Sequence, residues 1–586
     1  MDAGQTGHVF IALASHPDGA LLSPLDDAGE PAGEATVLAR AALPAEVSRR
    51  EFTSDRSSKD AADRPRWVWD DTTTWYPPLL AAGVRVERCV DLRLSHAILR
   101  NSELTAQTPL ARAVRNGWDE PTPEDQAQPR DGSRGVDEGL FDLEPEPGSE
   151  RTSALPDPVA EFRLQREAVA ASDDPARIGL LLAAESAGAL VAAEMQFAGL
   201  PWRAELHDRL LTELLGPRPK PGERPAKLAA VLERVRDALD APELNPDSPV
   251  ELMKTLQRAG LMITSTRSWD IKKLRHPVVE PLLEYKKLAR LLSANGWHWL
   301  DANVRDGRFR PDYVVGGVVT GRWASKGGGG ALQLPKQIRG AVVADPGFKL
   351  VVADASQLEP RILAALSGDA AMAEAGRAKD MYAAIVARGA VKTRDHAKVA
   401  MLGAMYGATT GESGRLMPAL AKAYPRAIGL VENAARAGER GEVVTTRLGR
   451  SSPRPGANWR ELQAAAYGES STDADASRAR GQARSWGRFT RNFVVQGTAA
   501  EWALCWMATL RGALRELGGS AWLTDAPHLV FFLHDELVVH SPAAMTDAVV
   551  AAIGSSAIEA GRLLFGSTPV EFPLSIAVVD SYADAK

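Results

Sequence analysis

One short apolar segment, residues 350–353, restricts the possible folds of this chain more than any other feature. It ends in Asp354 and is followed by Ser356-Gln357-Leu358-Glu359, a pattern that opens a helix. A short apolar run bounded in this way is typical of a buried β-strand, which leaves Asp354 at the end of that strand. The sequence therefore predicts a strand, a carboxylate and a helix in direct succession.

A second acidic position follows a similar pattern nearer the C-terminus. The tripeptide His534-Asp535-Glu536 separates two apolar segments, residues 529–533 and 537–539. Such segments predict two strands joined by an acidic turn. Carboxylates at the ends of separate strands can share a divalent metal site, so Asp354 and Asp535 are the predicted metal ligands. Taken alone, each aspartate could instead begin a turn or a helix.

A segment with regularly spaced cations lies between the two acidic positions. Arg394, Lys398, Leu402 and Tyr406 recur every four residues, which places them along one side of a helix. Two cations one turn apart can neutralise a triphosphate and its departing pyrophosphate, although a solvated basic face is the alternative. Carboxylates for metal ions, combined with cations for phosphate, predict a nucleotidyl transferase.

These segments resemble motifs A, B and C of the family A DNA polymerases, the class of bacterial DNA polymerase I, and they occur in the same order. Further matches are Thr320-Gly321-Arg322 and Arg339 before motif A, residues 446–450 after motif B, and Arg488, Asn492 and Gln496 before motif C. The resemblance runs from about Glu185 to the C-terminus. It implies an α+β right-hand polymerase, with palm, fingers and thumb, behind an N-terminal exonuclease-like α/β domain.

The resemblance also implies a role for each matching residue. Asp354 and Asp535 would hold two Mg²⁺ ions, for which Mn²⁺ could substitute, and Glu536 and Lys398 would complete the catalytic set, Lys398 by donating a proton to pyrophosphate. The residues implied in nucleotide binding are Arg394, Lys398, Leu402, Tyr406, Glu359, Gln357 and Tyr382. Those implied in DNA binding are Arg322, Arg339, Arg488, Asn492, Gln496 and His534.

Glu359 has two interpretations that do not exclude each other. Ser356 and Glu359 have the spacing of a capping box for the helix that begins there. In the family, the matching Glu blocks the 2′-hydroxyl of a ribonucleotide, which favours a DNA polymerase over the related single-subunit RNA polymerases. Ala355, Pro360 and Leu402 depart from the family pattern. They bear on fidelity and sugar discrimination rather than on the reaction.

Residues 1–117 are predicted to form an exonuclease-like (RNase H-like) domain without activity. No Asp-x-Glu occurs in residues 1–116, and Trp75 stands where the resemblance implies a metal-binding Asp. No replacement for a further Asp occurs near Val159. A domain without its metal ligands is expected to be a scaffold.

The remaining predicted segments are an acidic, Pro-rich disordered linker or insertion at 118–158, connecting helices and thumb at 159–303, and palm and fingers at 304–586. A net charge of −6 gives no support to a generally basic nucleic-acid binder, so local basic surfaces must serve. No signal pattern and no uninterrupted apolar stretch of membrane-spanning length occurs. We therefore expect a cytoplasmic, nucleoid-associated monomer without a membrane partner.

The expected function is addition of deoxynucleoside triphosphates to a primer 3′ end on primer-template DNA, in repair, gap filling or lesion bypass and without proofreading. One alternative is a polymerase that retains 3′–5′ exonuclease activity. The other is a catalytically silent primer-template binding protein. Retention of Asp354, Asp535, Lys398 and Tyr406 together speaks against silence, because binding alone would not need them.

Overall fold

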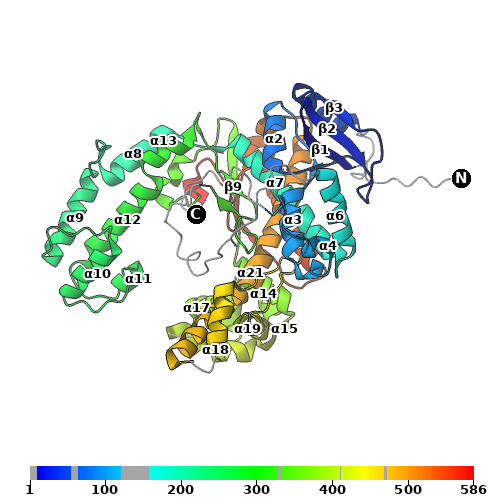
Figure 1. Ribbon diagram of the computed structural model, residues 1–586. Coiled ribbons are helices and arrows are strands. Elements are labelled where there is room, and N and C mark those ends of the chain that lie inside the picture. Colours follow the sequence, from blue (N-terminus) through cyan, green and yellow to red (C-terminus); the bar gives the residue numbers. More distant parts are fainter. Residues whose placement is uncertain are drawn as a thin grey trace. The chain divides into compact units, whose positions relative to one another are not determined.

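The computed structural model describes residues 10–53, 64–119, 157–326, 332–408, 411–466 and 471–585 (Figure 1). It separates into two compact units. The first comprises Met1–Ala198, Asp312–Gly328 and Val351–Ala577, and the second comprises Gly199–Pro311, Gly329–Leu350 and Val578–Lys586. Both units are discontinuous in sequence, so they divide the chain differently from the four consecutive domains predicted above.

The first unit begins with a five-stranded mixed sheet in the order β3-β2-β1-β4-β5. The strands are β1 (Phe10–His16), β2 (Gly19–Leu25), β3 (Thr36–Leu38), β4 (Arg66–Trp69) and β5 (Arg88–Asp91). β1 is antiparallel to β2 and parallel to β4, which is parallel to β5. Side chains alternate along a strand, so Ile11 and Leu13 enter one core cluster while Phe10 and Ala12 enter another.

Helices cover both faces of this sheet. They are α1 (Leu43–Thr53), α2 (Thr72–Ala81), α3 (Leu92–Asn101), α4 (Pro109–Arg112), α6 (Pro158–Ala170) and α7 (Pro175–Ala198). Residues of α1, α2 and α7 pack with Ile11, whereas Leu92 of α3 and Phe162 of α6 pack with Phe10. The expected α/β character of the N-terminal region is therefore present.

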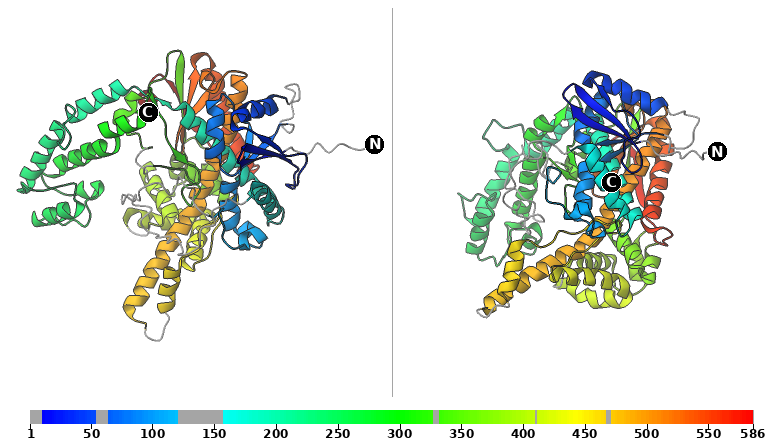
Figure 2. Two further views of the ribbon diagram at one scale, coloured as in Figure 1. Left: turned by 45° about the horizontal axis from the view of Figure 1, so that its top comes forward. Right: turned by 45° about the vertical axis from the view of Figure 1, so that its right-hand side comes forward.

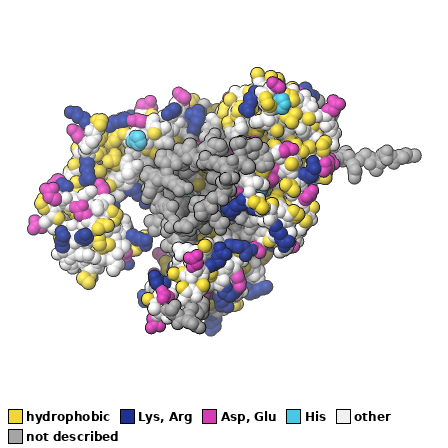
Figure 3. Space-filling view, viewed as in Figure 1, with side chains coloured by type: hydrophobic (Ala, Val, Ile, Leu, Met, Phe, Trp, Pro, Cys, Tyr) yellow, Lys and Arg dark blue, Asp and Glu magenta, His cyan; other side chains and the backbone are white. Residues whose placement is uncertain are grey.

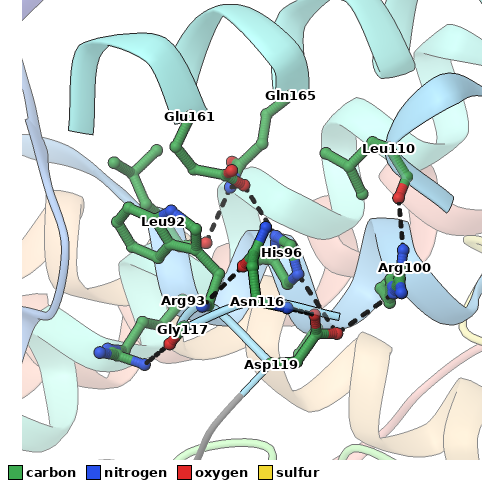
Figure 4. Close-up of polar contacts among 12 residues, drawn as sticks. Leu92, Arg93, His96, Arg100, Leu110, Asn116, Gly117, Asp119, Glu161 and Gln165 are labelled. Carbon is green, nitrogen blue, oxygen red and sulfur yellow. Dashed lines mark hydrogen bonds and ion pairs between the residues drawn. The ribbon is translucent and has the colours of Figure 1, made fainter. Parts of the chain in front are cut away.

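The position of α6 corrects the predicted boundary after residue 158. Trp118 and Phe162 belong to the same cluster as Phe10, and the rings of Phe10 and Phe162 lie 4.9 Å apart. His96 of α3 contacts both ends of the intervening segment: Nδ1 lies 2.8 Å from Glu161 and Nε2 lies 3.5 Å from Asp119 (Figure 4). The helix thus completes the N-terminal layer. Most of the predicted acidic segment, residues 120–156, lies outside the described residues.

Among the described residues, two helical segments, α7 and Ala543–Phe565, are long and apolar enough to cross a membrane by length and composition, although charged residues interrupt both. In α7, 67% of the apolar window is buried inside the protein. Its Glu194 is paired with Arg85 at 3.1 Å and Arg511 at 2.8 Å, and its Glu185 is paired with Arg450 at 3.0 Å. These buried ion pairs give α7 the character of a core helix.

A second sheet of the first unit has the order β12-β13-β11-β14. Its strands are β11 (Phe348–Ala355), β12 (His528–Leu533), β13 (Glu536–Pro542) and β14 (Leu574–Val579). The helices that follow or cover it are α14 (Leu358–Ser367), α15 (Ala370–Ala375), α16 (Met381–Ala387), α17 (Arg394–Tyr406), α18 (Gly411–Ala423), α19 (Pro425–Glu439), α20 (Ala457–Ala465), α21 (Asp473–Gly518) and α22 (Thr546–Phe565). The predicted α+β class is confirmed.

The long α21 connects the parts of the first unit (Figure 2). It has 46 residues, beginning in a capping box at Thr472 and Asp475, and it packs against α19, α7 and α22. Near its C-terminal end, Arg511 donates to the carbonyls of Val86 at 2.5 Å and Glu87 at 2.8 Å. One helix therefore spans from the N-terminal sheet to the helices around α17.

The second unit is mainly helical and has its own aromatic core. Its helices are α8 (Ala204–Leu215), α9 (Ala226–Leu239), α10 (Pro249–Arg258), α11 (Ser268–Ile271), α12 (Val279–Asn295) and α13 (Trp297–Asn303). A small sheet pairs β6 (Leu200–Pro201), β8 (Arg308–Phe309) and β7 (Val304–Arg305). Trp202, Trp299 and Phe309 meet with ring centroids 5.0 to 5.8 Å apart. Helices are thus present up to Asn303, as expected.

Candidate active site

The two predicted metal ligands come together on adjacent strands. Asp354 is the penultimate residue of β11, and β13 is its neighbour in the sheet. Asp535 lies in the turn between β12 and β13, and its backbone carbonyl accepts a hydrogen bond of 2.9 Å from the N–H of Ala355. Both carboxylates are partly exposed. The strand ends therefore meet at the residues that the sequence singled out.

Two local features shape the turn that carries Asp535. Leu533 pairs with Glu536, which leaves His534 and Asp535 as a two-residue turn, and His534 has a left-handed backbone with φ 58°. The register of β12 is irregular between Leu529 and Phe531. Next to this irregularity, the buried hydroxyl of Tyr313 donates to the carbonyl of Phe532 at 2.9 Å and accepts from its N–H at 2.8 Å.

The chemistry of this donor set fits a divalent cation that keeps part of its coordination open. Carboxylate oxygens are hard ligands, and Mg²⁺ commonly takes one or two carboxylates plus water and substrate phosphate. Among the described residues, no group of three or more His, Cys, Asp or Glu is placed to hold a metal ion. Glu536 is only 5% exposed at the start of β13. Asp354 and Asp535 are thus the two carboxylates that can bind such a cation.

Glu359 does not form the predicted capping box. The N-cap of α14 is Gln357, with φ 57° and no side-chain cap bond, while the hydroxyl of Ser356 lies 3.1 Å from that of Ser575. The carboxylate of Glu359 instead accepts a hydrogen bond of 2.9 Å from the hydroxyl of Tyr406 and pairs with Arg322. The left-handed Gln357 shifts the start of the helix by one residue, which takes Ser356 out of capping position.

The bonds of Glu359 join three distant segments. Arg322 follows β9 (Tyr313–Val314) in the turn before β10 (Ala324–Ser325), and Tyr406 is the last residue of α17. Tyr406 is 42% exposed. Burial and the cation of Arg322 both lower the pKa of the nearby His534. Arg322, Glu359, Tyr406 and His534 therefore form one charged and polar cluster beside the turn of Asp535.

The four regularly spaced residues lie on one helix, as predicted. α17 runs from Arg394 to Tyr406 and ends at Gly407, whose φ of 71° suits a glycine C-cap. Arg394 and Lys398 are exposed, and Leu402 is half-buried. The side chain of Lys398 makes no hydrogen bond or ion pair with any other described residue. On the face drawn in Figure 3, Lys and Arg side chains are frequent on the lobe that carries α17 and α18.

Gln357 and Tyr382 lie beside this helix through Asp380. The amide of Gln357 donates to Asp380 Oδ1 at 3.0 Å, and its Oε1 accepts from the N–H of Met381 at 2.8 Å. Asp380 also accepts from Arg394 Nε at 2.7 Å. Tyr382 is 6% exposed, and burial, assisted by the charge of Glu359, raises its pKa to about 12. The hydroxyl of Tyr382 therefore stays protonated near neutral pH.

The predicted DNA contacts fall into two groups. Arg488, Asn492 and Gln496 recur every four residues on α21, which puts them along one side of that helix. Arg488 packs closely on Gly407, where an added Cβ would come within 2.8 Å of its Cγ. Arg339 belongs to the second unit, where its guanidinium lies 4.4 Å from the ring centroid of Tyr582 and its Nε donates to the carbonyl of Leu334.

Arg361 supports the site and was not assigned a role from sequence. It is fully buried, and its guanidinium donates to five backbone carbonyls, those of Ser356, Gly376, Ala378, Lys379 and Glu571. Burial lowers its pKa to about 10, so it remains a cation. The available signal was an arginine inside the apolar face of a predicted helix, since such a residue must find acceptors.

The N-terminal sheet uses its strand-end carboxylates differently. Asp71 caps α2 by accepting from the N–H of Thr73, and Asp91 caps α3 by accepting from the N–H of Leu94. Both line a cavity of about 900 Å³ between α2, α3, α7 and β9, which none of the predicted site residues lines. Trp75 is buried, and its indole N–H donates to Asp70 at 2.6 Å. Asp71 and Asp91 thus bond backbone N–H groups at helix starts together with threonine hydroxyls, and Asp70 bonds an indole side chain.

Comparison with known proteins agrees with the motifs. The profile of DNA polymerase family A matches residues 223–579, which is more than half of the chain. The chain therefore belongs to DNA polymerase family A, and the resemblance seen in the sequence is confirmed. The thermostable DNA polymerase I of Thermus filiformis is 27% identical over 354 residues, and the DNA polymerase I of Chloroflexus aurantiacus is 29% identical over 321 residues.

The shared length is limited. These matches cover 55% and 50% of this chain but only 38% and 31% of the two relatives. A solved structure, the POL domain of Pol1 from M. smegmatis in complex with DNA primer-template and dNTP, aligns over 99% of this chain and 96% of its own, with a TM-score of 0.62 and 18% identity. That likeness extends the common fold over almost the whole chain.

Proposed function

We propose that this protein is a DNA-directed DNA polymerase, which adds deoxynucleotides from their triphosphates to the 3′ end of a primer paired with a template. The observation that carries the proposal is the contact between motif A and motif C. The N–H of Ala355 donates to the carbonyl of Asp535 at 2.9 Å, so the carboxylates of Asp354 and Asp535 project from neighbouring strand ends. Family membership supports the same reaction.

Asp354 and Asp535 would hold two divalent ions, Mg²⁺ or as a substitute Mn²⁺. Bound there, such ions supply activation of the primer hydroxyl and charge neutralisation of the triphosphate. Glu536, at the start of β13, would support the position of Asp535.

The cations of α17 would receive the triphosphate. Arg394 and Lys398 are exposed and one helical turn apart, so they can neutralise successive phosphates. Lys398 would give its Nζ proton to the departing pyrophosphate oxygen. Tyr406 and Leu402 continue the same side of the helix and would border the base and sugar of the incoming nucleotide.

Glu359 would select the sugar of the incoming nucleotide. The primer-template would be held by Arg322, Arg488, Asn492, Gln496 and Arg339. The carboxylate of Glu359 is fixed from two sides by Tyr406 and Arg322, so it can exclude a 2′-hydroxyl by occupying its space. Minor-groove acceptors are common to all correct base pairs, so arginine and amide contacts there sense pair geometry without reading sequence.

The proposal includes the absence of proofreading and a role in repair, gap filling or lesion bypass. Its support is that β1 carries no carboxylate and that Asp71 and Asp91 are committed to helix capping. The N-terminal sheet would then act as a scaffold.

A labelled hairpin primer, incubated with Mg²⁺ with and without deoxynucleotides, tests the proposal. Extension with nucleotides and an unchanged primer without them is the expected pattern. Shortening without nucleotides would establish a proofreading enzyme. Binding of the hairpin without either change would establish a silent primer-template binding protein.

A further inference from the structure

Asp380 connects the strand-end carboxylate region to the basic helix. Its Oδ1 accepts from the backbone N–H groups of Tyr382 at 3.0 Å and Ala383 at 3.2 Å, which makes it the N-cap of α16. The same oxygen accepts from the amide of Gln357. Its other oxygen, Oδ2, accepts from Arg394 Nε at 2.7 Å. One carboxylate therefore links the start of α14, α16 and α17.

The hydrogen bond to Nε determines which way the guanidinium of Arg394 faces. Neither terminal nitrogen of Arg394 bonds to another described residue, and the side chain is 54% exposed. The guanidinium also lies over the ring of Tyr382, 5.6 Å from its centroid, which supports its plane. Because Asp380 occupies only Nε, the two terminal nitrogens are available as a fork for a phosphate.

Asp380 is itself held in place from the side of β11. The left-handed Gln357, three residues after Asp354, bonds both the carboxylate of Asp380 and the N–H of Met381. Arg361 bonds the carbonyl of Lys379, next to Asp380 in the chain. Burial alone would raise the pKa of Asp380, but hydrogen bonds from Arg394, Ala383 and Gln357 lower it overall. An exposed ion pair adds little to folding stability, which leaves orientation of the guanidinium as its effect.

We propose that Asp380 is a positioning residue for the triphosphate, which holds Arg394 by Nε so that its two terminal nitrogens meet the phosphates of the incoming nucleotide. This inference rests on the proposed function, in which Arg394 binds phosphate. Loss of the contact should weaken nucleotide binding. The rate of the chemical step and the affinity for primer-template should stay nearly unchanged, because the proposal gives Asp380 no contact with the reacting atoms or with DNA.

The test uses Asp380→Asn and equilibrium binding of a deoxynucleotide to the enzyme on a dideoxy-terminated primer-template. Asparagine is as good an N-cap as aspartate. Its single oxygen can serve the cap but not Arg394 as well, so nucleotide affinity should fall about tenfold. On an extendable primer, KM should rise by a similar factor and kcat should stay within about threefold. The affinity for primer-template should not change.

Asp369→Asn is the matched control. Asp369 caps α15 by accepting from the N–H groups of Ala371 and Met372, and its other oxygen accepts from the N–H of Arg426. It holds no cation of α17, so nucleotide affinity should equal that of the wild type. An equal loss in both variants would show that disturbed helix capping, rather than Arg394, explains the effect, and would overturn the proposal.

A double-mutant comparison separates action through Arg394 from any independent role. If Asp380 acts through Arg394, then Asp380→Asn combined with Arg394→Gln should bind nucleotide no more weakly than Arg394→Gln alone. Additive losses would overturn the inference. Wild-type nucleotide affinity in Asp380→Asn would also overturn the inference. If the wild type extends the primer, the proposed polymerase function would not be affected by that result. A wild type that never extends the primer would overturn both.

Discussion

The N-terminal sheet and the sheet around β11 both place aspartates at or next to strand ends, but they use the carboxylates in different ways. Asp71 and Asp91 are followed at once by α2 and α3, and each caps the helix that it precedes. After Asp354 the helix begins only at Leu358, with Gln357 as its cap, and Asp535 is followed by a strand. The spacing between the aspartate and the start of the helix decides whether its carboxylate accepts hydrogen bonds from the first backbone N–H groups of that helix.

Burial separates Asp91, but not the partly exposed Asp71, from the C-terminal pair. Asp91 is 2% exposed, and burial, reinforced by the charge of Asp71, raises its pKa to about 7. Asp354 and Asp535 are partly exposed and adjacent across a strand pair. An aspartate after an apolar strand is therefore a weak sign of catalysis by itself. Exchanging carboxylates for amides in each region tests this difference.

The largest effect is expected at the C-terminal pair. Asp354→Asn or Asp535→Asn should abolish primer extension, because loss of a metal ligand costs several kcal/mol of transition-state stabilisation, roughly three or more decades in rate. Single-turnover extension measures this, and fluorescence anisotropy should show primer-template binding largely retained. Asp91→Asn, the strand-end control, should extend within about threefold of the wild type. Extension within tenfold of wild type in either metal-ligand variant would contradict the two-metal assignment.

Sugar selection should respond next. Glu359→Ala should raise ribonucleotide incorporation relative to deoxynucleotide at least about tenfold, or roughly 1.4 kcal/mol of discrimination, because it opens the space of the 2′-hydroxyl. Glu359→Gln keeps the size and loses the charge, so it should keep most of the discrimination. Competition between the two nucleotides at one template position measures both. An unchanged ratio in Glu359→Ala would remove Glu359 from sugar selection.

A smaller gain is expected from Leu402→Phe. An aromatic ring offers a flat surface to the incoming sugar, so the added contact should be on the order of 1 kcal/mol, about fivefold in nucleotide affinity. Steady-state extension should show a lower KM for deoxynucleotides with kcat moving less. A higher KM would mean that the pocket is built around leucine.

The pH dependence of folding tests the N-terminal carboxylate. The folded pKa of Asp91 is raised to about 7, above the ordinary value of 3.8, so its contribution to stability is greatest at low pH and declines as pH rises through 7. The amide of the Asp91→Asn variant cannot ionise. The thermal midpoint of the variant, relative to wild type, should therefore shift upward between pH 5 and pH 8 by the equivalent of on the order of 1 kcal/mol. A constant difference would mean that Asp91 is already ionised at low pH.

The protein is not expected to shorten a mismatched primer. A primer with a mismatched 3′ end, incubated with Mg²⁺ or Mn²⁺ and no nucleotides, should keep its length, because the strand-end carboxylates of the N-terminal sheet are used as caps. Gel analysis of the labelled primer measures this. Shortening that persists in Asp354→Asn would assign nuclease activity to the N-terminal region and erase the contrast between the two sheets.

Local sequence is sufficient to predict the elements that depend on short-range order. The apolar segment before Asp354 is β11, the two segments around Asp535 are β12 and β13, and the four-residue spacing from Arg394 is α17. Strand and helix periodicities, and a glycine that ends a helix, act within a few residues, so a local pattern is sufficient. The order of these motifs also identified the family.

Which side chains meet across the chain depends on tertiary packing. Glu359 bonds residues 37 and 47 positions away instead of capping its own helix, and Asp380 holds Arg394 from 14 positions away. The same holds for α6, which packs under a sheet that begins at Phe10. Such contacts depend on how several elements pack together, and the local pattern around any one of these residues is compatible with other partners. Spacing could therefore offer the capping box as an option, but packing ruled it out.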